Sequence, residues 1–153
     1  MPDSQQTMDE MVDEMFELTK LIYLARSRQK AGPDTLSETE FLTLDLLSKA
    51  GRLTIGEIQK RVGVVPAQMS RIVRALEEQG GRGFVECGIN PQDRRRVDVS
   101  LTEAGTRAHE TYRAARLSSM YEVLGVLAPQ DRLDFMRMMR QLRTTFERRL
   151  AQA

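Results

Sequence analysis

The chain has 153 residues, of which 41% are hydrophobic and 29% are charged, and this balance is typical of a folded globular domain. No run of about 18 apolar residues occurs, which excludes a membrane-spanning helix. The first residues lack the basic stretch and apolar core of a signal peptide, so we expect a cytoplasmic protein. A single cysteine and a single histidine exclude a disulfide within one chain and disfavour a zinc site, and we expect neither a metal nor another cofactor.

The formal net charge of +1 at first argues against a nucleic-acid partner. The distribution of this charge along the chain, however, favours such a partner. Residues 1–50 carry 5 basic and 10 acidic side chains, whereas residues 51–100 and 101–153 each carry 9 basic and 6 acidic ones. Arginine outnumbers lysine 19 to 4, and arginine suits bidentate contacts with phosphates and guanine edges. A GC-rich genome would also favour arginine codons, so composition alone leaves both interpretations open.

Two helices are predicted in the first third of the chain. The first covers about residues 8–30, where apolar side chains recur at helical spacing, and Ala31-Gly32-Pro33-Asp34 is expected to end it. The second begins at Ser37, which together with Glu40 makes a capping box, and Leu36 and Phe41 stand at the hydrophobic-staple positions. Gly51 is expected to close this second helix.

Residues 52–80 predict two short helices joined by the tight turn Gly63-Val64-Val65, with Pro66 at the first position of the second helix. In that helix four apolar residues follow one another at i, i+3, i+4 and i+7: Met69, Ile72, Val73 and Leu76. Two short helices with a glycine-containing turn are the pattern of a helix-turn-helix.

The periodicity then changes from that of a helix to that of a strand. Residues 84–89 and 96–101 predict a β-hairpin that carries Arg94, Arg95 and Arg96 at its tip. Thr102 is expected to cap a helix that begins just after it. The remainder, about 104–150, is helical, with a break before Pro129, and its last helix has an apolar stripe formed by Phe135, Met139, Leu142, Phe146 and Leu150.

If the apolar residues of the second short helix point inward, a polar face remains outside. It offers amide, hydroxyl and guanidinium groups, which are the side chains that read base edges and grip phosphates in a major groove: Gln68, Ser70, Arg71 and Arg74. Any surface helix exposes polar residues, so this face alone leaves an ordinary solvated surface as the alternative. A hairpin tipped with arginine directly after the helix-turn-helix favours a winged helix-turn-helix, because a wing arginine can enter the adjacent minor groove.

The stretch from Asp93 to Gly105 resembles the D-x-R…L-T-x-x-G wing signature of the MarR transcriptional regulators. The order of predicted elements is similar over nearly the whole chain. The resemblance implies a mainly α fold with a small β-hairpin wing, in which residues 35–103 form the DNA-binding domain. Residues 1–34 and 104–153 would supply the helices through which two copies interlock as a homodimer. The implied function is a transcriptional regulator, most often a repressor, that binds double-stranded DNA at a pseudo-palindromic operator.

Carried over by position, the resemblance makes about 66–79 the recognition helix and about 84–101 the wing. Arg95, with Arg94 beside it, would reach the minor groove, and Asp93 would orient Arg95. The chain departs from the family pattern at Gly80-Gly81-Arg82-Gly83, which is about three residues longer than expected. This extra length is expected to alter the exit from the recognition helix or the angle of the wing.

The sequence allows three other interpretations. Some members of the family sense oxidants through one cysteine, but Cys87 lies in the first wing strand, and an ordinary structural thiol is the favoured interpretation. Seven of the nine methionines lie in the terminal helical arms, where they suit dimer packing or a pliable pocket for a small, aromatic or lipophilic effector implied by the family. A protein-interaction module with a degenerate helix-turn-helix is the remaining alternative. No nucleophile with a base and no phosphate loop is legible, so no enzyme is expected.

Overall fold

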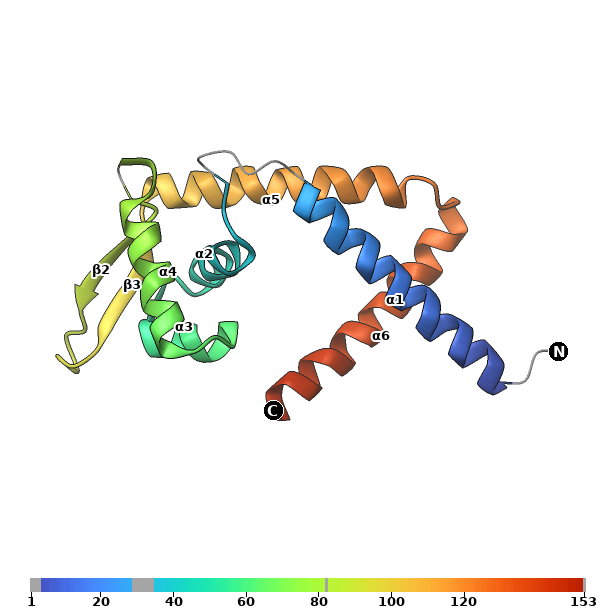
Figure 1. Ribbon diagram of the computed structural model, residues 1–153, viewed down its shortest axis with the longest axis horizontal. Coiled ribbons are helices and arrows are strands. Elements are labelled where there is room, and N and C mark those ends of the chain that lie inside the picture. The colour runs from blue at the N-terminus through green and yellow to red at the C-terminus, as the bar shows by residue number, and fades with distance from the viewer. Residues whose placement is uncertain (1–3, 29–34, 82, 153) are drawn as a thin grey trace. The chain divides into compact units, whose positions relative to one another are not determined.

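The computed structural model describes residues 4–28, 35–81 and 83–152. It divides into two compact units, Met1–Thr35 and Leu36–Ala153. The first unit holds the helix α1 (Ser4–Arg28). The second holds, in chain order, α2 (Glu38–Ala50), β1 (Arg52–Thr54), α3 (Ile55–Val62), α4 (Pro66–Glu78), the short 3-10 turn η1 (Gln79–Gly81), β2 (Val85–Ile89), β3 (Val97–Leu101), α5 (Glu103–Leu124) and α6 (Pro129–Gln152) (Figure 1). The predicted end of the first helix at 31–34, and Arg82, lie outside the described residues.

The predicted start and stop of α2 are confirmed. The Ser37 Oγ accepts from the Glu40 N–H, and the Ser37 N–H donates to the Glu40 carboxylate at 2.7 Å. Leu36 and Phe41 are both buried, as the staple requires. Gly51 ends the helix at φ 77°, a conformation that favours glycine, and its N–H donates to the Leu47 carbonyl.

The sheet has three strands, in the order β1-β3-β2, whereas the sequence predicted a two-stranded hairpin. The missed strand β1 has only three residues, which is too short for an alternating pattern to show. It pairs antiparallel with β3, so that Leu53 stands opposite Val99 and both side chains are buried. This pairing attaches the wing to the helix-turn-helix, because α3 begins at the residue directly after β1.

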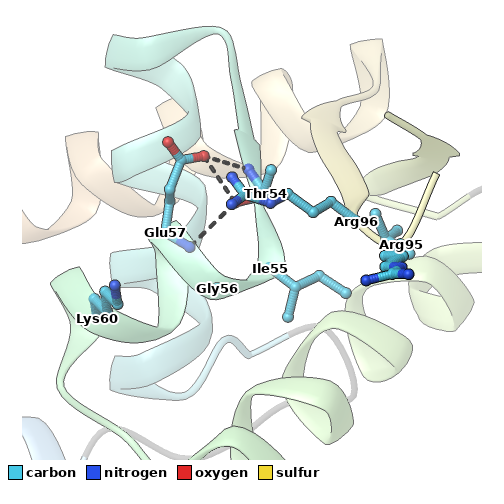
Figure 2. A pocket seen from close by; sticks show the side chains of 8 residues that line it. Thr54, Ile55, Gly56, Glu57, Lys60, Arg95 and Arg96 are labelled. Atoms are coloured by element: carbon cyan, nitrogen blue, oxygen red, sulfur yellow. Dashed lines mark hydrogen bonds between the residues drawn. The ribbon is translucent and has the colours of Figure 1, made fainter. Parts of the chain in front are cut away.

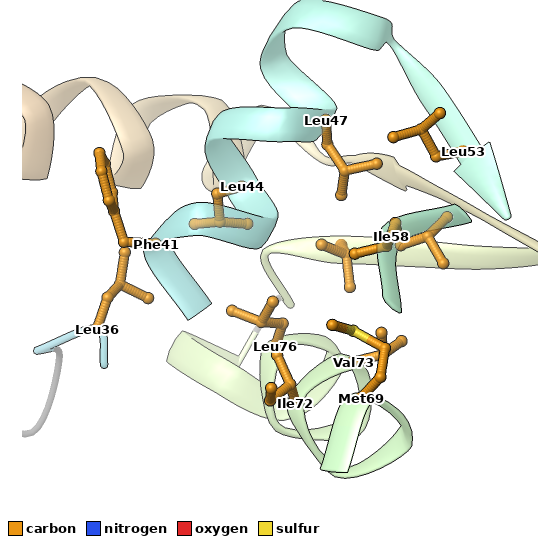
Figure 3. Packing of buried hydrophobic residues seen from close by; sticks show 12 residues of the cluster. Leu36, Phe41, Leu44, Leu47, Leu53, Ile58, Met69, Ile72, Val73 and Leu76 are labelled. Carbon is orange, nitrogen blue, oxygen red and sulfur yellow. The ribbon is translucent and has the colours of Figure 1, made fainter. Parts of the chain in front are cut away.

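One hydrophobic core holds α2, α3, α4 and the sheet together (Figure 3). The four residues predicted to face inward from the second short helix are all buried: Met69, Ile72, Val73 and Leu76. Leu44, Ile58 and Val99 are fully enclosed against them. Burying a side chain of this size contributes roughly 1.5–3 kcal/mol. The orientation of α4 is therefore set by packing, and its opposite face is left for contacts outside the chain.

The helix α5 begins against the start of β2. The Thr102 Oγ accepts from the Gly105 N–H at 3.0 Å, which confirms the predicted cap, and donates to the Gly83 carbonyl at 2.7 Å. The Thr102 N–H donates to the Phe84 carbonyl at 3.1 Å. These bonds join the base of the wing to the first turn of α5.

A second set of contacts fastens α5 to α2. The Arg116 guanidinium lies 4.6 Å from the Phe41 ring centre and 4.8 Å from that of Tyr112, and it pairs with both oxygens of Glu38. His109, for which the sequence suggested no role, is 7% exposed, and its Nε2 lies 3.0 Å from the Asp45 Oδ1. The histidine is therefore part of the junction between two helices.

The terminal helices bury little of their apolar surface. Neither α1 nor α6 contains a buried residue, and large apolar side chains on both are exposed, such as Met8, Phe16, Leu142 and Phe146. Among the described residues, no helix combines the length and the apolar character that crossing a bilayer would require.

Candidate nucleic-acid interface

The helix α4 carries the first half of the candidate site. Pro66 stands in its first turn, and Val65, which precedes it, caps the helix without a side-chain hydrogen bond. All four residues expected on the reading face are exposed: Gln68, Ser70, Arg71 and Arg74. The Ser70 hydroxyl donates to the Pro66 carbonyl at 3.2 Å, which leaves its oxygen as an acceptor. Within the described part of the chain, neither Arg71 nor Arg74 has a carboxylate within ion-pair distance.

The angle between α3 and α4 depends on a short, well-bonded turn. Gly63 adopts a left-handed conformation with φ 76° and ψ 31°, and its N–H donates to the Gln59 carbonyl at 3.0 Å. The Gln59 amide nitrogen donates in turn to the Val64 carbonyl at 2.5 Å. The turn thus presents α4 to solvent at a defined angle to α3.

The wing loop is built around one asparagine. The Asn90 side-chain oxygen accepts from the N–H groups of Gln92 and Asp93, both at 2.9 Å, and its amide nitrogen donates to the Asp98 carboxylate at 2.8 Å. Because Asp98 is buried in β3, this bond ties the loop to the strand below it. The sequence predicts a turn at Asn90-Pro91-Gln92-Asp93, and the structure confirms it.

Asp93 contacts two of the three wing arginines in different ways. Its Oδ1 accepts from the main-chain N–H of Arg95 at 3.1 Å, and its Oδ2 lies 3.2 Å from the Nε of Arg96. The carboxylate therefore holds the backbone at Arg95, while its ion pair is with Arg96. The side chains of Arg94 and Arg95 are exposed, and the described residues place no carboxylate within ion-pair distance of either.

A hollow of about 380 Å³ lies between the start of α3 and the wing loop that leads into β3 (Figure 2). It is lined by Thr54, Ile55, Gly56, Glu57, Lys60, Arg95, Arg96 and Val97. Three of these side chains are cationic and one is a carboxylate. No pattern in the sequence indicated Lys60 or Gly56. The capping box of Thr54 and Glu57 was the one sequence signal nearby, and it indicates where α3, the helix that contains Gly56 and Lys60, begins.

Cys87 is in an environment that disfavours its thiolate. Partial desolvation of the thiol, together with its hydrogen bond to the Glu77 carboxylate and that group's charge, raises the pKa of Cys87 to about 12. A thiol with so high a pKa is a poor nucleophile at neutral pH. In the described segments no group of three or more His, Cys, Asp or Glu side chains is arranged to hold a metal ion.

The combination of helix-turn-helix, wing and exposed arginines defines a winged-helix DNA-binding protein, and comparison with known proteins agrees. Residues 36–97 match the MarR family. A transcriptional regulator of the helix-turn-helix type from Mycobacterium bovis, Mb0904, is 33% identical over 107 residues, which cover 70% of this chain and 71% of the relative. The repressor MdtR of Bacillus subtilis is 28% identical over 72% of this chain and 67% of its own length. The chain belongs to the MarR family of transcriptional regulators.

Solved structures show the same fold. The YusO protein of Bacillus subtilis superimposes with a TM-score of 0.73 and 24% identity, covering 93% of this chain and 98% of that one. Streptococcus pneumoniae FabT, solved in complex with DNA, gives a TM-score of 0.68 with 20% identity over 94% and 98% of the two chains. Bordetella bronchiseptica BpsR, whose DNA binding is regulated by 6-hydroxynicotinic acid, gives 0.63 with 20% identity over 86% and 98%.

Proposed function

We propose that the protein is a homodimeric transcriptional repressor that binds a pseudo-palindromic operator and is released by a small-molecule effector. The DNA-binding part of the proposal rests on four exposed arginines that lack an ion-pair partner in the described part of the chain. Arg71 and Arg74 on α4, and Arg94 and Arg95 on the wing, extend from elements held by one core, and none has an ion-pair partner among the described residues. Desolvated against phosphate or base edges, such cations gain contacts that the chain itself does not give them.

In this proposal α4 enters the major groove with Gln68, Ser70, Arg71 and Arg74 toward the bases, and Arg95 enters the neighbouring minor groove, with Arg94 beside it. Asp93 serves to hold the wing turn in which Arg95 stands. The solved complex of FabT with DNA supports the use of this fold on a duplex. The two half-sites of the operator should lie about 10–10.5 bp apart, centre to centre, because paired recognition helices meet successive major grooves on one face of the duplex.

The dimer is proposed from the terminal helices. Both α1 and α6 leave their apolar stripes exposed, with Met8, Met15, Met139 and Leu142 each at least 43% accessible. Faces of that extent are expected to be covered in solution, and a second copy of the chain would cover them in a symmetric assembly. The acidic first third of the chain would then keep DNA away from the dimerising end.

The effector part rests on family relatives. The solved structure of BpsR is described with 6-hydroxynicotinic acid as a regulator of its DNA binding, which supports an aromatic or lipophilic ligand of similar size here. Ligand binding would favour one spacing of the two DNA-binding units over another, as a population shift between dimer geometries. A cytoplasmic location follows from the same proposal, since the operator is chromosomal.

DNA selection followed by binding titrations tests the proposal. The purified full-length protein is incubated with random duplexes, and the enriched sequence is titrated with wild type, Arg74→Ala, Arg95→Ala and the control Arg107→Ala. Arg107 carries the same charge but pairs with Glu103 on the exposed side of α5. We expect Arg74→Ala and Arg95→Ala to weaken binding by about 10-fold or more while the dimer persists, and Arg107→Ala to bind like wild type. If no sequence is enriched, the protein-interaction alternative gains ground and the DNA-binding proposal fails.

A further inference from the structure

We infer that Val65, the residue that precedes α4, contacts the 5-methyl group of a thymine in each half-site of the operator. The inference rests on the proposed function and deepens it, because it names a side chain that selects a base. It concerns an apolar contact, whereas the reading face of α4 consists of polar and cationic side chains.

The start of α4 is apolar and exposed. Val65 is 64% exposed, and Pro66 and Ala67, which follow it, are exposed as well. These three residues are called the apolar tip. The other side of the helix packs on the core (Figure 3), so the packing of α4 leaves its apolar tip in water. The described helices α2, α3 and α4 expose one other large apolar side chain, that of Leu42 at 39%, so an accessible valine is unusual in this part of the chain.

Val65 also lacks a stabilising bond that the neighbouring helices have. The helices α2, α3 and α5 each begin with a hydroxyl that accepts from a main-chain N–H, those of Ser37, Thr54 and Thr102. Val65 occupies the same place before α4 and makes no side-chain cap, and valine is among the least favourable residues at such a position. Since local stability would favour a hydroxyl, a contact outside the chain explains the valine better.

The major groove offers one apolar group to such a tip. Every base pair presents hydrogen-bond donors and acceptors there, and thymine alone adds a methyl group. In a helix-turn-helix, the residues at the N-terminal end of the recognition helix meet the base edges, and Val65 stands at that end of α4. Removing the valine and thymine methyl groups from water together is favourable, whereas valine gains no hydrogen bond from a phosphate or an amino group. The apolar tip therefore favours thymine over the other three bases.

The backbone at Val65 is already ordered. Its carbonyl accepts from the N–H groups of Gln68 at 3.0 Å and Met69 at 3.1 Å. The preceding carbonyl, that of Val64, accepts from the side-chain amide of Gln59. Valine is also stiff about χ1, because its Cβ is branched. A contact made by this side chain therefore loses little conformational entropy on binding.

Three substitutions of Val65 separate base selection from stability. Val65→Ala removes the contact, and Val65→Ser removes it while adding a capping hydroxyl, which should raise the melting temperature by about 2–4 °C. Val65→Thr adds the hydroxyl but keeps one methyl group, so it should retain part of the thymine preference. We expect Val65→Ser to melt above wild type and yet to bind the selected operator about fourfold more weakly per half-site, the factor that corresponds to one methyl group returned to water.

Val126→Ala is the matched control for the truncation. Val126 lies in the connection between α5 and α6 and is 84% exposed. The change removes the same two methyl groups outside the helix-turn-helix, so Val126→Ala should bind the operator like wild type.

Uracil in place of thymine tests the contact from the side of the DNA, since it removes the methyl group and leaves the hydrogen bonds of the base pair unchanged. Each thymine of the selected operator is replaced in turn, and the affinities of full-length wild type and Val65→Ala are measured. One position in each half-site should weaken wild-type binding about fourfold and have no effect on Val65→Ala. DNA selection repeated with Val65→Ala should return the same operator with that position no longer restricted to thymine.

Three results would overturn the thymine contact while leaving the proposed function intact: an operator with no such position, equal uracil sensitivity of wild type and Val65→Ala, or full affinity of Val65→Ser. Loss of the dimer in Val65→Ala, measured by sedimentation, would also overturn it, because the valine would then pack on a second copy of the chain. Failure of the wild-type protein to bind any DNA would overturn both proposals together.

Discussion

Gly105 is where the attachment of the wing to α5 can be tested most directly. A Cβ built on Gly105 lies 1.8 Å from the Phe84 carbonyl oxygen and 2.7 Å from its carbon. Both are main-chain atoms, so no side-chain rotation can relieve the contact. The Phe84 oxygen accepts from the Thr102 N–H, and the Thr102 hydroxyl caps α5 at Gly105 itself. Gly105→Ala must therefore separate the start of β2 from the first turn of α5.

The size of the effect follows from that separation. Ordinary van der Waals contact begins near 3.4 Å, compared with the 1.8 Å found for the Cβ, so the two segments must part by more than 1 Å. A shift of that size breaks the Thr102–Phe84 hydrogen bond, at about 1 kcal/mol, and adds overpacking strain of about 1–3 kcal/mol. The better helix propensity of alanine returns up to about 1 kcal/mol. We expect a net loss of about 1–4 kcal/mol, or roughly 2–16 °C in melting temperature.

Thermal unfolding followed by circular dichroism measures this loss, with Gly56→Ala as the control. Gly56 stands in the first turn of α3, as Gly105 does in that of α5, but its added Cβ meets nothing within 4 Å. Gly56→Ala should thus raise the melting temperature, whereas Gly105→Ala should lower it. Gly105→Ala should also weaken operator binding at a temperature where it is still folded, because the wing loses its anchor. A Gly105→Ala protein as stable as Gly56→Ala would refute this account of the wing attachment.

The wing turn, the thiol and the terminal helices give three more predictions. Asp93→Ala should weaken operator binding by about fivefold even though it removes a negative charge, because the turn loses a bond of about 1 kcal/mol; tighter binding in gel shifts would show that charge alone matters. Alkylation of Cys87 at pH 8 should be far slower than that of a thiol with the ordinary pKa of 9.0, since a pKa of about 12 lowers the thiolate fraction about a thousandfold. Glu77→Gln should speed the alkylation, because it removes the carboxylate charge beside the thiol; equal rates in wild type and Glu77→Gln would contradict the contribution of Glu77 and leave desolvation as the cause. Leu142→Asp on the apolar stripe of α6 should dissociate the proposed dimer in sedimentation experiments, while Thr144→Asp on the opposite side should not; a dimer that survives Leu142→Asp would place the interface elsewhere.

What could be predicted from the sequence was local. The capping box at Ser37, the cap at Thr102 and the proline that opens α4 depend on residues within four positions of one another, and the structure contains all three. The inward face of α4 was equally legible, because its spacing repeats over two turns.

What could not be predicted depends on residues far apart in the chain. The strand β1 exists because Leu53 meets Val99 across the sheet, and three residues carry no period of their own. The stacking of Arg116 on Phe41 joins positions 75 residues apart. The hollow likewise combines Lys60 with Arg95, and nothing near either residue in the sequence indicates the other.

The abundance of arginine had two interpretations, a codon preference or an interface, and the contacts of individual residues separate them better than composition does. Some arginines are used inside the fold: Arg107 pairs with Glu103, and Arg116 with Glu38 across two helices. Arg71, Arg74, Arg94 and Arg95 have no such partner in the described segments, and their backbones are held by the core beneath α4 and by the hydrogen bonds of Asn90 and Asp93 in the wing. The charge of such an arginine is not neutralised by the chain, and its backbone is already ordered, so a ligand would gain the ion pair without the entropy cost of ordering that backbone. A codon preference would supply the arginines, but it would not by itself place these four on the exposed side of α4 and in the wing loop.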